Sequence, residues 1–458
     1  MSALHDFVKK FEPDHENKFL HTTYDAFYTF LFQPGEVTKG GTHVKDGMDL
    51  KRLMVHVVLA LQLLYVFGTW NIGHQHFTAL GQYPGLLEGF HLKLVYGLVK
   101  MIPIFLVTHV VGLGIEFIYA AKKGHSVEEG FLVSGALIPL IMPPDIPLWI
   151  LAVSIAFAVV LGKEAFGGTG MNIWNIALLA RVFIFFAYPT TISGDEVWIA
   201  GMEKLPETGA WVGQQYGGIY SFFDWIFSGL GASTFGEGGA YMLSAADGVT
   251  GATPLGLAAK GGWAEVTQYY STDQMFWGAI PGSIGESNKL FIILGMFFLA
   301  VTKIADWRII VGGVFGFIFC SLLMNAMAPD VFTENTQGIF KFMAIPWYYQ
   351  MIMGSFLFSI AFMATDPVSA ASTPTGKWIY GFMIGLIGLI VRVWNPAYPE
   401  GWMLAILFMN TFAPLIDHYV FQANIKRRAK RGAELAAVRD ELITEKQGRM
   451  DILTPENV

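Results

Sequence analysis

Apolar runs long enough to cross a lipid bilayer recur through most of this chain. A helix that spans roughly 30 Å of hydrocarbon needs about 20 mostly apolar residues, and we predict ten such spans. Hydrophobic residues make up 53% of the 458 residues and charged residues only 14%, which is typical of a membrane protein. The predicted spans lie near residues 53–70, 94–120, 127–143, 146–162, 172–190, 290–305, 308–329, 347–364, 378–393 and 401–421.

Two features of this pattern leave alternatives open. The third and fourth spans are separated only by the turn at residues 143–145, so they form either two crossings or one re-entrant pair. The fifth span contains Arg181, and Lys100 and Glu116 also fall within predicted spans. We expect these charges to be paired or to lie at helix ends, because an isolated charge in hydrocarbon is costly.

Lysine and arginine predict the orientation of the spans. With ten crossings, most of the basic residues in short loops fall on one side, which is typical of the cytoplasmic face. Both termini then lie in the cytoplasm, and the long loop 191–289 lies on the outer face. The N-terminal residues mix charges without an apolar core, so we expect no secretory signal. The tail AELAAVRDELITEKQ has the spacing of a charged amphipathic helix.

The predicted fold is an all-α polytopic membrane protein. Five spans on each side of the long loop give two repeats with opposite orientation, an arrangement similar to that of urea transporters. The predicted segments are a cytoplasmic N-terminal segment 1–52, a first five-helix repeat 53–190, an outer loop 191–289, a second repeat 290–421 and a cytoplasmic tail 422–458.

Composition restricts the chemistry that this chain performs alone. Cys320 is the single cysteine, so the chain cannot build a disulfide framework or a four-thiolate iron–sulfur or zinc site. The formal net charge of −7 shows no basic bias and argues against nucleic acid as a partner. Any iron–sulfur centre must therefore belong to a partner protein.

Small and polar residues form three further motifs. DGVTGAT, residues 247–253, lies in the long outer loop. FGGTG, residues 166–170, precedes the fifth span, and its glycines allow either a tight turn or the close approach of a flat ligand. This glycine motif matches neither of the common nucleotide-binding patterns. TDPVSAASTP, residues 365–374, breaks the apolar pattern after the eighth span, and Asp417 lies near the cytoplasmic end of the last span.

These motifs together resemble one family. DGVTGAT, FGGTGMN, RVFIFFAYPTTISGD, FWGAIPGSIGES, MATDPVSA and APLIDHYVFQANIKRR are similar to the B subunit of the sodium-translocating NADH:quinone oxidoreductase. The resemblance covers roughly residues 50–430. The related D subunit of the Rnf complex shares the spanning core but lacks so long an N-terminal extension, so segment 1–52 favours the quinone reductase.

The resemblance implies a covalently bound flavin. In this family the second threonine of the motif carries FMN through a phosphoester bond, and here that residue is Thr253. The motif residues around it are Asp247, Gly248, Thr250, Gly251 and Ala252. Small residues leave the backbone uncrowded for a separate flavin transferase that presents FAD, so Thr253 is an attachment point and no catalytic residue is implied.

The resemblance also implies the remaining cofactors and the partners. The family carries electrons from FMN through non-covalent riboflavin to ubiquinone, coupled to Na⁺ transport across the bacterial inner membrane. Other subunits hold FAD, iron–sulfur centres and a second covalent FMN. Gly167 and Gly168 match positions implicated in binding quinone-site inhibitors, and Asp417 matches an acidic residue associated with sodium uptake.

Two departures and two alternatives remain at this point. About 30 residues follow the NIKRR motif without a match, and Asn-Ile-Ala stands at 175–177 where the family pattern has Asn-Pro-Ala. The alternatives are an Rnf-type electron-transport subunit, which would carry the same FMN, and a redox-inactive channel or transporter, which would carry no chromophore.

Overall fold

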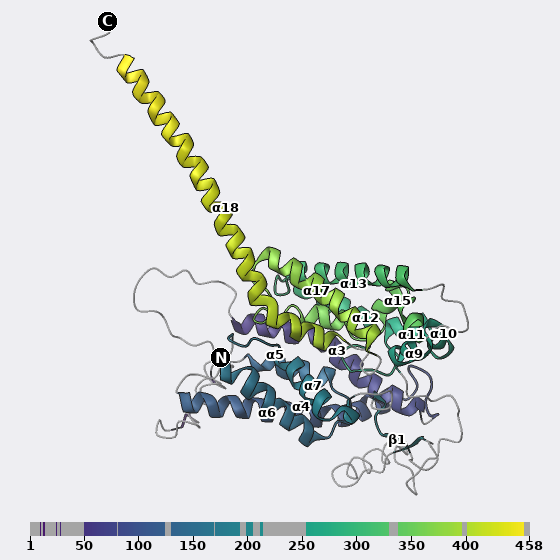
Figure 1. Ribbon diagram of the computed structural model, residues 1–458. Helices are drawn as coiled ribbons and strands as arrows, with labels where there is room; N and C mark the ends of the chain where they lie inside the picture. Colours follow the sequence, from purple (N-terminus) through teal and green to yellow (C-terminus); the bar gives the residue numbers. More distant parts are fainter. Residues whose placement is uncertain are drawn as a thin grey trace.

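A computed structural model of the chain describes most of the membrane region (Figure 1). The described residues are 10, 12–13, 24, 28, 50–79, 81–123, 130–168, 170–192, 198–204, 211–213, 253–328, 338–395 and 401–452.

Long apolar helices dominate the described residues, as predicted. Six of them are long and apolar enough to cross a membrane, and three shorter ones are also apolar. The six are α3 (Leu50–Ala79), α4 (Phe90–Lys123), α6 (Leu148–Gly162), α13 (Trp307–Met327), α17 (Pro374–Trp394) and α18 (Trp402–Ile452). The three are α5 (Phe131–Ile141), α7 (Ile176–Ala187) and α12 (Lys289–Val301). The chain is an all-α polytopic membrane protein, and its division into two five-helix repeats remains a prediction.

The outward faces of these helices are apolar. Val66 on α3 is 63% exposed and Val110 on α4 is 71% exposed, although both lie in the middle of long helices. Water would penalise such surfaces, whereas lipid hydrocarbon does not. The exposed valines therefore mark the lipid-facing surface of the bundle.

Shorter elements make up the rest of the secondary structure in the described residues. They are η1 (Glu164–Phe166), η2 (Pro189–Thr191), α9 (Pro254–Gly261), α10 (Trp263–Tyr269), α11 (Thr272–Trp277), α14 (Gly338–Met343), α15 (Trp347–Ile352), α16 (Phe356–Phe358) and the π-helical η4 (Ser359–Met363). Strands β1 (Met202–Lys204) and β2 (Trp211–Gly213) form an antiparallel pair, with Glu203 opposite Val212.

The predicted span 347–364 differs from the structure. It consists of α15, α16 and η4 instead of one continuous helix. Gly354 lies between α15 and α16 with φ of +65°, a conformation that interrupts a helix and that glycine adopts without a Cβ clash. Composition alone predicted the apolar segment but not this break.

Helices α13 and α17 approach each other through glycines. A Cβ atom on Gly385 of α17 would lie 2.1 Å from the carbonyl oxygen of Gly313 on α13, and one on Gly316 would lie 2.0 Å from that of Phe382. Only glycine permits such close backbones, as in the small-residue interfaces of membrane helices. Figure 1 shows the two helices side by side.

Hydrogen bonds join α3–α7 to the later part of the chain, which comprises the turn before α12 and the helices α12–α18. The Gly285 amide donates a hydrogen bond to the Leu140 carbonyl at 2.8 Å. The Asn71 side chain on α3 donates to the Ile280 carbonyl at 3.0 Å. Trp174, just before α7, donates to Thr411 of α18 at 2.9 Å.

Lys100 and Glu116 are each paired with an opposite charge inside the bundle, as the sequence predicts. The Lys100 ammonium donates to Asp145 at 2.5 Å, and Asp145 also accepts from the Gly201 amide at 2.5 Å. Lys163 forms a buried ion pair with Glu116. These pairs reduce the cost of placing charge in a low-dielectric environment.

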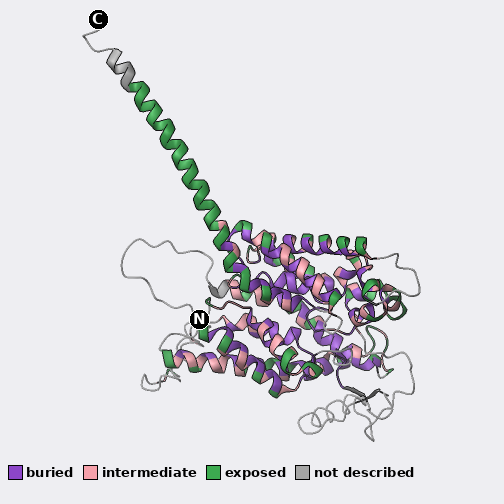
Figure 2. Cartoon of the chain, viewed as in Figure 1, coloured by how far each residue is buried: buried purple, intermediate pink, exposed green. Residues whose placement is uncertain are grey.

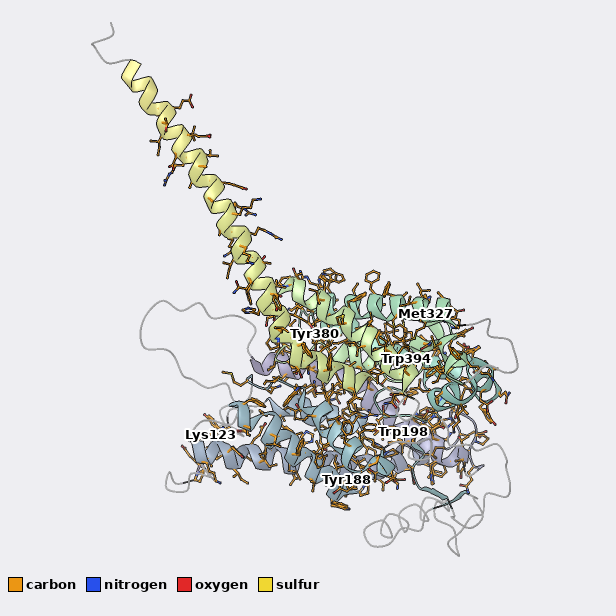
Figure 3. The ribbon with its side chains drawn as sticks, in the orientation of Figure 1. Lys123, Tyr188, Trp198, Met327, Tyr380 and Trp394 are labelled. Atoms are coloured by element: carbon orange, nitrogen blue, oxygen red, sulfur yellow. The ribbon has the colours of Figure 1, made fainter. Side chains whose placement is uncertain are left out.

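The two ends of the helix bundle differ. Helices α9, α10 and α11 and strand β1 lie at one end, and α18 leaves the bundle at the other as a long helix (Figure 1). Figure 2 shows that this emerging part is exposed along its described length. In Figure 3, Lys123 lies at the end from which α18 emerges, whereas Met327 and Trp394 lie toward the opposite end. The helical tail predicted from its spacing is thus continuous with the last span.

Candidate functional site

Thr253 caps the first turn of α9. Its Oγ1 accepts a hydrogen bond from the Gly256 amide at 3.1 Å, and Pro254 follows at the first helical position. The side chain is half-buried. The other predicted motif residues, which are Asp247, Gly248, Thr250, Gly251 and Ala252, lie outside the described residues.

A narrow cavity of about 20 Å³ lies beside Thr253. Residues from three separate parts of the chain form its walls, so tertiary folding and not the motif alone creates the environment of the threonine. The lining residues are Thr253, Pro254, Leu255, Ile280, Pro281, Gly282, Glu286, Ser287, Lys289 and Gly354.

Two charged side chains in this cavity were not predicted from the sequence. Lys289 is fully buried at the start of α12, and Glu286 is 5% exposed in the preceding turn. Glu286 lies within the motif FWGAIPGSIGES and Lys289 lies two residues after it, but nothing in that motif indicates that they reach Thr253. A charged residue among small and apolar ones is the signal that would have selected them.

A larger cavity of about 610 Å³ lies next to the Thr253 cavity and shares Pro281 with it. Its walls combine aromatic rings with a few polar groups, a composition typical of cofactor sites. They are formed by His74, Gln75, Thr78, Ala79, Pro84, Gly85, Leu86, Ile199, Tyr269, Tyr270, Asp273, Gln274, Trp277, Ala279 and Pro281.

Gly167 and Gly168 form the tight turn after α6 and η1. Their φ angles are +124° and +104°, which L side chains rarely adopt. The Gly168 amide donates to the Lys163 carbonyl at 3.1 Å, and Gly167 is exposed. The positive φ angles explain the two glycines structurally, and the exposed backbone of Gly167 is open to a ligand.

A cavity of about 80 Å³ lies close to this glycine turn, between α3–α7 and α12–α18. Asp366, from the predicted polar break, lines it but was not selected from the sequence as a site residue. Burial raises the pKa of Asp366, although hydrogen bonds from Ser369 and the Val368 amide oppose this effect. Lys163, Asn172 and Asn175 line the same cavity.

Asp417 lies on α18 and binds the start of α17. One carboxylate oxygen accepts from the Ser372 amide at 2.6 Å. The other accepts from the Thr373 amide at 3.0 Å and the Thr373 hydroxyl at 2.5 Å. This carboxylate therefore stabilises a helix N-terminus, and no group of three His, Cys, Asp or Glu suited to a metal occurs in the described residues.

The predicted site residues fall at two ends of the bundle. Thr253 lies at the start of α9, at the end opposite the emergence of α18 (Figure 1). The turn of Gly167 and Gly168 follows the C-terminus of α6, at the same end as Lys123, whose ammonium donates to Glu164 of η1 at 3.3 Å (Figure 3). The fold thus separates the threonine from the glycine turn.

Comparison with known proteins determines the family. A family model described as "NQR2, RnfD, RnfE family" matches residues 37–426. The chain belongs to this family. The match covers every described membrane helix except the emerging part of α18, which agrees with the unmatched tail noted in the sequence.

Curated relatives are similar over nearly the whole chain. A protein of Ectopseudomonas mendocina (strain ymp) is 42% identical over 431 residues, which are 90% of this chain and 94% of that protein. A protein of Chromohalobacter salexigens is 40% identical over 438 residues, 92% of this chain and 94% of that protein. A protein of Azotobacter vinelandii is 41% identical over 431 residues, 90% and 94% respectively. Each is named as the B subunit of a Na⁺-translocating NADH-quinone reductase.

Proposed function

We propose that this chain is the B subunit of a Na⁺-translocating NADH:quinone reductase. The observation that carries the proposal is the similarity to relatives of that name at 40–42% identity along about nine-tenths of the chain. The membrane fold and the order of the six motifs support the same function.

Within this proposal, Thr253 carries FMN. The Thr253 hydroxyl would be the acceptor of FMN from FAD held by a flavin transferase: it would lose its proton and form the phosphoester bond as the phosphoanhydride bond of FAD breaks and AMP leaves. The residues fit such a group because Thr253 is half-buried at the start of α9 and lines a cavity. The Thr253 hydroxyl oxygen faces the N-terminus of α9, and the partial positive charge of that helix end favours an anionic phosphodiester.

The cavity of about 610 Å³ is the proposed location of the flavin ring. The cavity at Thr253 measures only about 20 Å³, too small for a flavin ring, so only the phosphodiester end of the flavin would lie beside Thr253. Tyr269, Tyr270 and Trp277 in the larger cavity offer aromatic surfaces to a flat ring.

The flavins supply the redox chemistry, with electrons passing from FMN through riboflavin to ubiquinone. The turn of Gly167 and Gly168 would bind the flat quinone headgroup against exposed backbone. Asp417 would take part in Na⁺ uptake through the carboxylate lone pairs that its three hydrogen bonds leave open.

The proposed setting is the bacterial inner membrane, with both termini in the cytoplasm and Thr253 toward the outer face. Partner subunits would hold FAD, iron–sulfur centres and a second covalent FMN. Neutralisation of charge on a reduced flavin by an incoming cation explains why electron transfer and Na⁺ movement are coupled, because uncompensated charge is costly in a low dielectric.

The test is covalent flavin on the full chain, produced in a host that contains the transferase. Wild type should run as a flavin-fluorescent band on a denaturing gel, and its intact mass should exceed that of the bare chain by FMN less one water. Thr253→Ala should lose both signals, whereas Thr253→Ser, which keeps a hydroxyl, should retain some modification. An unmodified wild-type chain would contradict the proposal and favour a redox-inactive transporter.

A further inference from the structure

Lys289 is a buried cation in the wall of the Thr253 cavity. Its side chain is 0% exposed, and its ammonium donates to the carbonyl oxygens of Glu286 and of Gly354, the latter at 3.1 Å. Both acceptors are neutral, and one N–H of the ammonium remains for another acceptor. A buried ammonium is costly unless an anion compensates it.

Glu286 does not provide that compensation through a direct ion pair. Its Oε1 accepts from the Ser283 amide at 2.9 Å, while its Oε2 is buried without a hydrogen-bond partner in the described part of the chain. Among the described ion pairs, none within 4.0 Å joins Glu286 to Lys289. Lys289, a buried cation, and Glu286, whose Oε2 is buried without a described partner, therefore line the same cavity.

We propose that Lys289 binds the phosphodiester of the flavin carried by Thr253 and that Glu286 binds its ribityl chain. This inference rests on the proposed function of Thr253. A phosphodiester carries one negative charge at neutral pH and offers two free oxygens, which suits an ammonium with a donor to spare. The ribityl hydroxyls donate hydrogen bonds, which suits Oε2 of Glu286.

The proposal assigns a separate task to each residue. Lys289 fixes the anionic linker at the base of α9, beside the helix end that Thr253 caps. Glu286 holds the sugar-like chain where the small cavity meets Pro281, the residue shared with the larger cavity. Together they would direct the ring toward the larger cavity, and both are positioning residues.

A purely structural role for Lys289 predicts a loss of stability that does not depend on flavin. Its bonds to two carbonyls join the start of α12 to the turn at Gly354, and their loss would destabilise the chain whether or not flavin is attached. Phosphate binding instead contributes only to the flavinylated chain. A comparison of both forms therefore separates the two roles in the manner of a double-mutant cycle.

The experiment measures the melting temperature of the full chain in lipid nanodiscs, produced with and without the flavin transferase. Intact mass spectrometry gives the flavin occupancy of each sample. We expect flavin attachment to raise the melting temperature of wild type. Lys289→Gln should lose at least half of that increment, and Lys289→Arg, which keeps the charge, should restore most of it.

Glu286→Gln is a second variant, and it tests the contact with the ribityl chain. It keeps the size of the side chain but removes the negative charge that strengthens a hydrogen bond from a ribityl hydroxyl, so the flavin-dependent increment should shrink. The inference on Lys289 is overturned if the increment in Lys289→Gln equals that of wild type, and the inference on Glu286 is overturned if the increment in Glu286→Gln equals that of wild type. If Lys289→Gln does not fold, Lys289→Met, which removes the charge without adding a polar group to the cavity, takes its place in the comparison. A wild-type chain that carries no flavin despite the transferase would refute the proposed function instead.

Discussion

The glycine contact between α13 and α17 allows a quantitative prediction for Gly385→Ala. The added Cβ would lie 2.1 Å from the Gly313 carbonyl oxygen, whereas ordinary contact begins at 3.4 Å, so the difference of 1.3 Å must come from movement of the helices. Neighbouring glycines hold the two backbones equally close, since a Cβ on Gly381 would meet the Ile309 oxygen at 2.3 Å. A local adjustment therefore cannot relieve the clash.

The cost of this overpacking is about 1–3 kcal/mol. Replacing glycine by alanine within a helix recovers roughly 0.5–1 kcal/mol, so the net effect should be a destabilisation of about 1 kcal/mol, and at most about 2.5 kcal/mol. Gly114→Ala on α4 is the matched control, because a Cβ there meets nothing within 4 Å. That variant keeps the helix-propensity gain without the clash and should be as stable as wild type or slightly more so.

The assay is thermal unfolding of the purified chain in nanodiscs, followed by tryptophan fluorescence and by the fraction that remains monodisperse after heating. Gly385→Ala should melt below wild type, and Gly114→Ala should not. Equal melting temperatures for the two variants would refute the argument, because they would show that α13 and α17 tolerate separation without loss.

Three further predictions concern charged residues. Burial favours a higher pKa for Asp306, but hydrogen bonds, including one from Lys377 at 2.8 Å, outweigh it and hold the pKa below its usual value. The stabilising contribution of Asp306 is therefore present above about pH 4 and lost as the pH falls through the lowered pKa of Asp306. The melting temperature of Asp306→Asn should therefore depend less on acidification than that of wild type. Asp417→Ala removes the hydrogen bonds at the start of α17 and should cost about 0.5–2 kcal/mol, measured as a lower melting temperature. Asp417→Asn should lose less. An unchanged melting temperature for Asp417→Ala would show that these hydrogen bonds are dispensable. Lys163→Met removes the ammonium that pairs with the buried Glu116 carboxylate and should cost about 3–5 kcal/mol. Adding Glu116→Leu to that variant should recover most of the stability. A double variant no more stable than Lys163→Met would contradict the pairing.

Much of the fold could be predicted because membrane helices are encoded locally. Apolar length alone located α3, α4, α13, α17 and the first part of α18. The break at Gly354 was missed because a positive φ angle depends on tertiary packing and leaves the apolar composition unchanged. The short length of α7 follows from Asn175, whose side chain accepts from the Leu178 amide and caps the helix.

The candidate site was predictable only in part. The short motif DGVTGAT is sufficient to select Thr253 as the proposed attachment residue. Lys289 and Glu286 reach it only through folding, and no local pattern connects them to α9. The hydrogen bonds of Asp417 to Ser372 and Thr373 likewise join α18 to the start of α17. The sequence therefore shows only a single carboxylate, whereas the structure shows that it binds the N-terminus of another helix.

Hydrogen bonds between α3–α7 and the later part of the chain restrict how these two parts can move against each other. Alternating access by rocking would move α3–α7 as a rigid body against α12–α18. Such a movement would break the backbone bond from Gly285 to Leu140, the Asn71 bond to Ile280 and the Trp174 bond to Thr411 in one step. Under the proposed function, cation passage would therefore use small, local gates at the helix breaks, with the body of the bundle acting as a fixed frame.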